Sequence, residues 1–272
     1  MKKTILLASI FAITAAWPTF AQTPTAPITP VMSQQVAPTP FELWREGKYD
    51  QAMAAGEAAK TPEGLSVAAR AAVSDMSLRI PPCLDCETRA EAIVRKAMAA
   101  DPKAVLPKIY LAAVLGYEGR LVGLMQAQSK GFADQSKKAL QDGLAIDPKD
   151  PLLLATMGGW NFEIIRIAGS FIARLTYGAT EDEGVKYFDE AMKIAPDELL
   201  INYQSALALA SVDPDKYHDR IKAALSRAVA AKADSVYYSV SQKRAADLLK
   251  LLNSGDSNAF ATMLKKYMGI PT

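Results

Sequence analysis

The sequence predicts an all-α protein built from a stack of helical hairpins. Alanine, the residue with the highest helix propensity, is very common, and no window alternates apolar and polar residues strictly enough for a strand. Prolines and glycines fall between the helical stretches, and similar segment endings recur along the chain. Recurrence of this kind indicates a repeat architecture.

The first 21 residues have the organisation of a secretory signal peptide. Lys2 and Lys3 supply a positive start, and an apolar run follows over residues 5–17. The small residues Thr19 and Ala21 occupy the two positions that a signal peptidase inspects. The apolar run is too short to span a bilayer as a helix. We therefore expect export, with an uncleaved N-terminal anchor as the alternative. A lipoprotein is excluded because no cysteine lies near the cleavage site.

Residues 22–40 are expected to form a linker, which leaves residues 41–272 for a helical-repeat domain. The linker carries five prolines and no charge, and proline favours extended backbone. Cleavage would remove two of the 31 basic residues and none of the 29 acidic ones. A neutral chain lacks the basic surface that binds nucleic acid. No later run of eighteen apolar residues predicts a membrane span.

The first expected hairpin begins at Glu42, with Gly47 between its two helices and Tyr49 opening the second. Three later segments end alike. In each, a proline stops the helix, and a small residue lies five positions before that proline. These pairs are Ala97 and Pro102, Gly143 and Pro148, and Ala191 and Pro196. This ending resembles that of the tetratricopeptide repeat. The resemblance implies a right-handed solenoid in which each hairpin packs on the next.

The repeats are longer than those of that family. The three prolines are 46 and 48 residues apart, whereas the family period is about 34 residues. We therefore expect insertions at Tyr117–Ser129 and Ile167–Thr180, between the first and second helix of each hairpin. Residues 213–232 are expected to form another second helix. Two further helices, Val236–Leu252 and Ser257–Tyr267, are expected to cap the stack. A cap is needed because the apolar face of the last repeat has no neighbouring repeat to bury it.

The stretch from Lys108 to Ala210 is similar to a more particular group. It resembles the tetratricopeptide-like domain of the regulator of microtubule dynamics family and of related exported bacterial proteins. It also resembles the periplasmic T component of TRAP transporters, a helical-repeat protein with an apolar tunnel. The matching strings are Gly116-Tyr-Glu-Gly119, Ala139-Leu, Asp147-Pro-Lys-Asp150, Met157-Gly-Gly-Trp160 and Tyr187-Phe followed by Ala191. The resemblance implies a fold and little about activity.

Cys83 and Cys86 are the only cysteines, and they precede a predicted helix. In an oxidising periplasm we expect a structural disulfide between them. Unpaired thiols and a redox-active pair are the alternatives, and the second would normally need a thioredoxin-like strand–helix–strand setting. The chain has one histidine, His218, which excludes histidine-based triads and multi-histidine metal sites. No catalytic residue, metal site or cofactor is predicted.

The segment from Gly158 to Tyr177 is the candidate binding site. Two adjacent glycines in a helix cost about 1 kcal/mol each relative to alanine, so close helix contact or room for a ligand should compensate. Aromatic anchors and a few fixed polar groups are typical of binding sites. We expect five side chains to converge beneath the second insertion, with Glu163 paired to an arginine: Trp160, Glu163, Arg166, Arg174 and Tyr177. An internal network that only holds the inserted loop is the alternative.

Three functions remain open from the sequence. The leading one is a periplasmic binding or scaffold protein that recognises a peptide, a partner protein or an apolar small molecule. The second is an accessory subunit of a solute transporter or envelope machine. The third is a thiol enzyme that uses Cys83 and Cys86. We expect no enzyme, no nucleic acid partner and no integral membrane segment after signal cleavage.

The signal peptide generates the first prediction. The order of charge, apolar run and small residues predicts cleavage after Ala21. N-terminal sequencing of protein recovered from the periplasm should begin at Gln22. Recovery of a chain that retains Met1 in the membrane fraction would contradict this.

Overall fold

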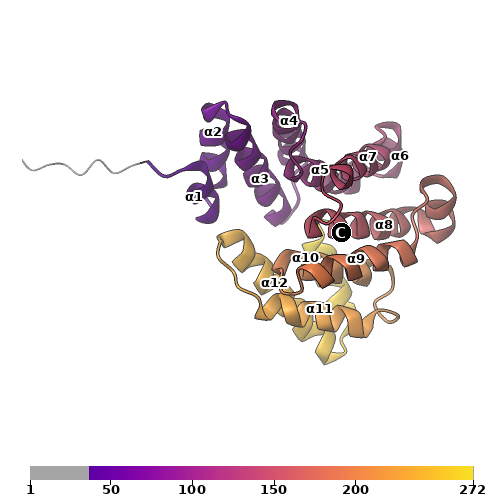
Figure 1. Ribbon diagram of the computed structural model, residues 1–272. Coiled ribbons are helices and arrows are strands. Elements are labelled where there is room, and N and C mark those ends of the chain that lie inside the picture. The colour runs from indigo at the N-terminus through magenta and orange to yellow at the C-terminus, as the bar shows by residue number, and fades with distance from the viewer. Residues whose placement is uncertain (1–36, 272) are drawn as a thin grey trace, which may run out of the picture. The chain divides into compact units, whose positions relative to one another are not determined.

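Thirteen α-helices and one π-helix make up the part of the chain that the computed structural model describes, residues 37–271 (Figure 1). These residues contain no strand, so the predicted all-α class is confirmed. The expected signal peptide and nearly all of the linker lie outside the described residues. None of the described helices is long and apolar enough to cross a membrane.

Most helices pack in consecutive pairs, and each pair has a first and a second helix. The pairs are α1 (Pro40–Arg45) with α2 (Tyr49–Ala59), α3 (Pro62–Leu78) with α4 (Leu84–Ala100), α5 (Leu106–Val122) with α7 (Phe132–Ile146), α8 (Pro151–Ile172) with α9 (Glu181–Ile194), α10 (Leu199–Val212) with α11 (His218–Ala230), and α12 (Val236–Ser254) with α13 (Ser257–Tyr267).

Side-chain caps explain where many of these helices begin. A cap accepts a hydrogen bond from one of the free backbone N–H groups in the first turn. Thr39 and Glu42 form a reciprocal capping box at α1, and Thr180 accepts from the backbone of Glu183 at α9. Other helices are capped in the same way by Thr61, Cys83, Asp150, Ser235 and Asp256.

The two expected insertions lengthen α5 and α8 and add a short element after each. After α5 the chain forms α6 (Leu124–Ser129) before α7 begins. After α8 it forms the π-helix Ala173–Tyr177. α8 itself kinks at Gly169, whose φ of 76° is a left-handed conformation that suits glycine. α13 has the expected range and α12 begins at the expected residue but runs on to Ser254, whereas α11 is shorter than expected. It begins only at His218 because residues 213–217 form a turn.

Small residues bring neighbouring helices close together. A methyl group on Gly143 of α7 would lie 2.7 Å from Leu153 of α8. A methyl group on Gly158 of α8 would lie 2.7 Å from the ring of Phe188 on α9. That ring stacks on Phe162, and Phe162 meets Tyr217 edge-on. The core therefore lies between the first and second helices of successive pairs.

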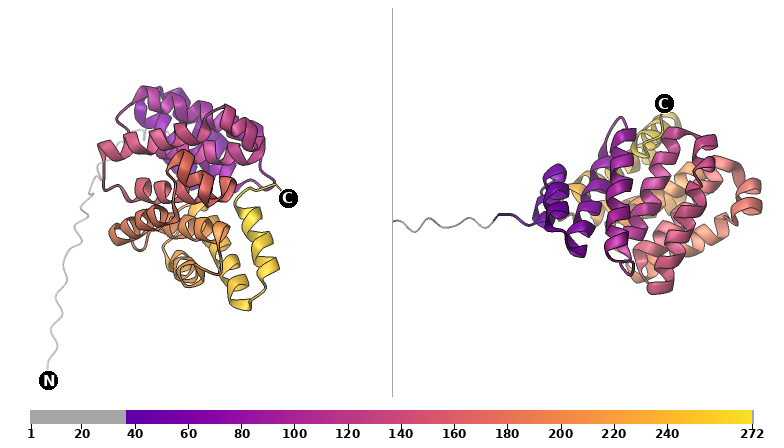
Figure 2. Two further views of the ribbon diagram at one scale, coloured as in Figure 1. Left: turned by 90° about the vertical axis from the view of Figure 1, so that its right-hand side faces the viewer. Right: turned by 90° about the horizontal axis from the view of Figure 1, so that it is seen from above.

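The first helices form a closed ring of packed neighbours. Along the chain α3 packs against α5, α5 against α8, α8 against α10 and α10 against α12, and α12 returns to α3. α1 packs beside α3. The left view of Figure 2 shows the N-terminal half of the helical domain, indigo to magenta, above the C-terminal half, orange to yellow. The hairpin stack thus curves until its last pair meets its first.

Hydrogen bonds across the meeting point join residues far apart in sequence. Arg244 of α12, which is buried, donates from Nη1 to the carbonyl of Ser77 over 3.1 Å and from Nη2 to that of Leu78 over 2.7 Å. These carbonyls end α3, where they lack helical partners. Arg45 donates to the carbonyl of Asp234 over 3.2 Å.

A disulfide joins Cys83 and Cys86 at the start of α4. The Cys83 sulfur also accepts a hydrogen bond from the backbone N–H of Cys86 over 3.2 Å, so it caps the helix. The bridge spans three residues in sequence and belongs to the loop that connects α3 to α4. Its position gives it a local structural role.

The ring closure generates the second prediction. Arg244→Met keeps most of the aliphatic packing but leaves the last carbonyls of α3 without their charged donor. We expect the free energy of unfolding to fall by roughly 2–3 kcal/mol. Urea denaturation measures this. The matched control is Lys243→Met, at a position whose side chain is 77% exposed on the same helix; it should change stability by less than about 0.5 kcal/mol. Equal stability of the two variants would contradict the closure argument.

Candidate functional site

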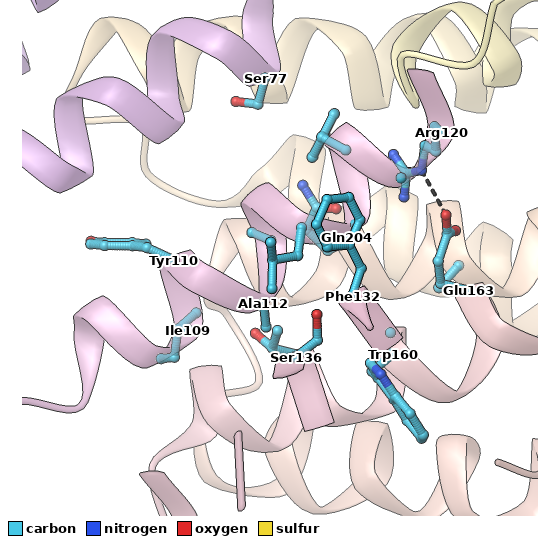
Figure 3. Close-up of a pocket in the computed structure, with 18 of the residues that line it drawn as sticks. Ser77, Ile109, Tyr110, Ala112, Arg120, Phe132, Ser136, Trp160, Glu163 and Gln204 are labelled. Atoms are coloured by element: carbon cyan, nitrogen blue, oxygen red, sulfur yellow. Dashed lines mark hydrogen bonds and ion pairs between the residues drawn. The ribbon is translucent and has the colours of Figure 1, made fainter. Parts of the chain in front are cut away.

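A cavity of about 540 Å³ lies inside the ring of first helices (Figure 3). All six first helices line it, together with α6, the start of α7 and the π-helix. Most of the lining is apolar or aromatic, and it includes Ile109, Phe132, Trp160, Ile164 and Leu207. Cavities of this size and character hold small molecules in many proteins.

The two adjacent glycines of α8 have different roles. Gly158 permits close contact with α9, since an added methyl group would meet Phe188 at 2.7 Å and the Gly184 carbonyl at 2.9 Å. Gly159 lines the cavity, and an added methyl group there would have no neighbour within 4 Å. The expected close helix contact thus occurs at Gly158, whereas Gly159 faces open space. The glycine at 159 leaves space that a side chain would otherwise fill.

Trp160 lies in the cavity wall, and two contacts hold its side chain. Its indole N–H donates to the carbonyl of Ala133 over 3.1 Å. The Lys137 ammonium lies 5.1 Å from the ring centre and donates to the carbonyl of Tyr177 over 2.6 Å. These contacts tie the wall of α8 to α7 and to the π-helix. Asn161, the next residue, is buried and accepts from the backbone N–H of Thr180 over 3.0 Å.

Glu163 is the centre of a partly buried ion-pair network. It accepts from Arg120 Nε over 2.8 Å and from Arg166 Nε and Nη2 over 3.0 and 2.7 Å. Arg120 also donates to the carbonyl of Met268 near the C-terminus. Burial alone would raise the pKa of Glu163, but the charge of Arg120 and the hydrogen bonds from both arginines outweigh it and lower the pKa to about 2. This carboxylate is therefore ionised and already paired.

A second buried carboxyl group, that of Glu87 on α4, feels the charge of Arg120. Both of its oxygens lack a hydrogen-bond partner among the described residues. Burial and the negative charge of Glu118 raise its pKa to about 7, although Arg120 opposes the shift. Glu118 itself pairs with Lys130 over 2.9 Å. Neither glutamate lines the cavity.

The structure brings some of the five predicted site residues together and separates one. Trp160, Glu163 and Tyr177 line the cavity. Arg166 does not line it but holds Glu163. Arg174 is exposed on the π-helix and lies outside the lining, because this helix buries Ala173 instead. Of the neighbouring aromatic rings, Phe162 fills the core and Phe171 is exposed.

The structure adds polar residues to the site that the sequence analysis missed. Arg70 of α3 and Gln204 of α10 both line the cavity, as does the hydroxyl-bearing Ser136. In Figure 3 Tyr110 lies to the left of Gln204 and the Arg120–Glu163 pair lies to its right. The sequence does not single out Gln204, because Asn202 and Ser205 are polar neighbours on the same helix; the structure leaves Gln204 exposed and buries those two. Arg70, by contrast, interrupts a run of alanines and valine.

The insertions carry exposed apolar side chains next to the cavity. Leu124 and Ile172 contribute to its lining. Their neighbours Met125, Phe171 and Leu175 are 87%, 77% and 73% exposed. Large exposed apolar side chains in a group are typical of contact surfaces. α6 and the π-helix therefore flank the cavity with a surface suited to an apolar partner.

Comparisons with protein-family models and with curated proteins give no match for this chain. Within residues 37–271 no group of three or more histidine, cysteine, aspartate or glutamate side chains could hold a metal ion. The disulfide at Cys83 and Cys86 is not part of the cavity lining. The central cavity is thus the site that the geometry singles out.

The glycine pair generates the third prediction. Gly158→Ala gains helix propensity but forces a methyl group against Phe188, so we expect a net loss of roughly 1–2 kcal/mol in unfolding free energy. Gly159→Ala places the same methyl group in open space and should stabilise the protein by about 0.5–1 kcal/mol. Guanidinium denaturation of both variants checks the signs. Because the residues are adjacent in one helix, each variant is the control for the other, and shifts of the same sign would contradict the assignment.

Proposed function

We propose that this chain is an exported binding protein that holds an apolar small molecule inside a closed right-handed solenoid of tetratricopeptide-like hairpins. One observation carries the proposal. The first helices of all six hairpins surround a mostly apolar cavity of about 540 Å³. Binding, not catalysis, is the activity that such a lining supports.

The cavity is too large to be an ordinary packing defect. Protein interiors are packed at about 0.74 of their volume, and few voids exceed the size of a water molecule. An unfilled apolar space also forfeits dispersion contacts along its whole wall. Gly159 and Gly116 both face open space at the lining, where larger side chains would have filled it. This pattern supports a space kept for a ligand.

Export to the periplasm is part of the proposal. The signal-like N-terminus is its main support in the sequence. The disulfide between Cys83 and Cys86 adds a second argument, since disulfides persist in oxidising compartments. Because this disulfide lies outside the cavity lining and caps a helix, a thiol enzyme is the least favoured of the three functions.

A second candidate function is supported by the insertions. Met125, Phe171 and Leu175 are exposed beside the cavity, and such groups often mark protein interfaces. A partner protein bound there would make this chain an accessory subunit of a transporter or envelope machine. The two functions are compatible, because a partner at the insertions would sit next to a ligand in the cavity.

The fourth prediction tests the cavity as a binding site. A neutral fluorescent probe, N-phenyl-1-naphthylamine, should bind to the exported protein and gain fluorescence. Gly159→Phe places a ring in the cavity and should weaken probe binding by about tenfold or more. Native mass spectrometry of protein purified from the periplasm should in parallel reveal any ligand that stays bound.

Two controls keep this test specific. Gly159→Ala adds only a methyl group and should retain probe binding. Ala54→Phe adds the same ring at an exposed position on the outer helix α2 and should also retain it. If the probe binds equally well to Gly159→Phe, or fails to bind the unmodified protein at all, the cavity is not the binding site and the proposal is wrong.

A further inference from the structure

Arg70 gives the cavity an unbalanced positive charge. Three charged side chains line the cavity, namely Arg70, Arg120 and Glu163. Glu163 forms ion pairs with Arg120 and with Arg166 behind it. Arg70 forms no ion pair among the described residues, although it is half buried. Burying a charge without a partner is costly, so this position calls for an explanation.

Aromatic residues hold the Arg70 guanidinium in a fixed orientation. Its Nε donates to the hydroxyl of Tyr110 over 3.0 Å. Its central carbon lies 4.9 Å from the ring centre of Trp44 and 5.5 Å from that of Phe41. The two terminal nitrogens make no hydrogen bond to any described residue. Four N–H donors of a positioned guanidinium are therefore unused next to an apolar space.

The surroundings of Arg70 add a further hydrogen-bond donor, and the nearby carboxylate of Glu198 makes no ion pair with Arg70. Burial raises the pKa of Tyr110, so its hydroxyl keeps a proton. The hydroxyl accepts from Arg70, and its own proton has no acceptor among the described residues. The nearby Tyr238 donates to Glu198 over 2.9 Å, which occupies that carboxylate. The side chains of Arg70 and Tyr110 thus leave several N–H and O–H donors available to an anion.

We propose that the ligand of the cavity is an alkyl carboxylate, an amphiphile with one negative charge, whose carboxylate binds Arg70 and whose chain lies along the apolar lining. This inference rests on the proposed function, because it names the ligand class of the same cavity. The planar guanidinium presents paired N–H groups that match the two oxygens of a carboxylate. A singly charged head also balances the single unpaired charge of the lining.

A neutral head group is the competing occupant. The Gln204 amide lines the cavity without a hydrogen-bond partner among the described residues, and the Ser136 hydroxyl is likewise available. These groups would serve an alcohol or an ester equally well. The Arg70 charge decides between the two classes, since a neutral head would leave it unpaired.

The fifth prediction compares two molecules with the same chain. Dodecanoate and 1-dodecanol are titrated, below their aggregation limits, against protein loaded with N-phenyl-1-naphthylamine. Dodecanoate should displace the probe at a concentration about tenfold or more below that of dodecanol, as expected for charge-assisted hydrogen bonds. Arg70→Gln should remove this preference and leave the affinity for dodecanol unchanged. Arg70→Lys keeps the positive charge but loses the paired N–H groups of the guanidinium. Its preference for dodecanoate should therefore lie between those of Arg70→Gln and the unmodified protein.

The outcomes separate the two proposals. Arg227→Gln, at an exposed position on α11, is the matched control and should keep the preference for dodecanoate; circular dichroism checks that every variant is folded. If dodecanol binds as well as dodecanoate, or if Arg70→Gln weakens both alike, the head-group assignment is wrong while the cavity function stands. If the probe does not bind the unmodified protein, the proposed function itself fails.

Discussion

The interaction on which the rest of the structure depends is the return of α12 to α3. Without it, the first helices would form an open curve and would face solvent along one side. Arg244 makes the contact by donating to the carbonyls that end α3, a position where a helix leaves acceptors free and favours positive charge. Because the contact joins residues more than 160 positions apart, it becomes favourable only after the intervening hairpins have packed. The enclosed space is therefore a property of the whole stack, and no single hairpin contains it.

A second set of contacts keeps that space from collapsing. The network around Glu163 joins α5 to α8, and through Arg120 it reaches the C-terminal segment at Met268. A half-buried triad of this kind is costly to break, since removal of one member strands the others. It acts as a spacer in which one carboxylate is shared by two arginines. Arg120, Glu163 and Arg166 lie in the C-terminal halves of α5 and α8, so this spacer lies next to the insertions.

Helix boundaries could be predicted from the sequence, because they depend on residues close together in the chain. The residues that meet only when the ring of first helices closes could not be predicted. The hairpin boundaries follow from caps, prolines and small residues within a few positions of one another, which is why α12 and α13 could be predicted closely. Trp160, Glu163 and Tyr177 lie in one segment whose mixture of residues was visible. Arg70 and Gln204 come from helices far away in sequence, and only the ring brings them to the same space. Arg174 lies near the others in sequence, but the π-helix leaves it exposed, because a π turn presents a different set of side chains than an α turn would.

Tryptophan placement has an optical consequence. The two tryptophans of the helical domain, Trp44 and Trp160, both line the cavity, whereas the third, Trp17, belongs to the predicted signal peptide. Tryptophan emission from the helical domain thus originates entirely from the walls of its central space. Trp44 stacks beside the Arg70 guanidinium, and Trp160 lies beside the Lys137 ammonium. Single replacement of either indole by phenylalanine would leave one reporter, so the two regions of the cavity can be observed separately without an added label.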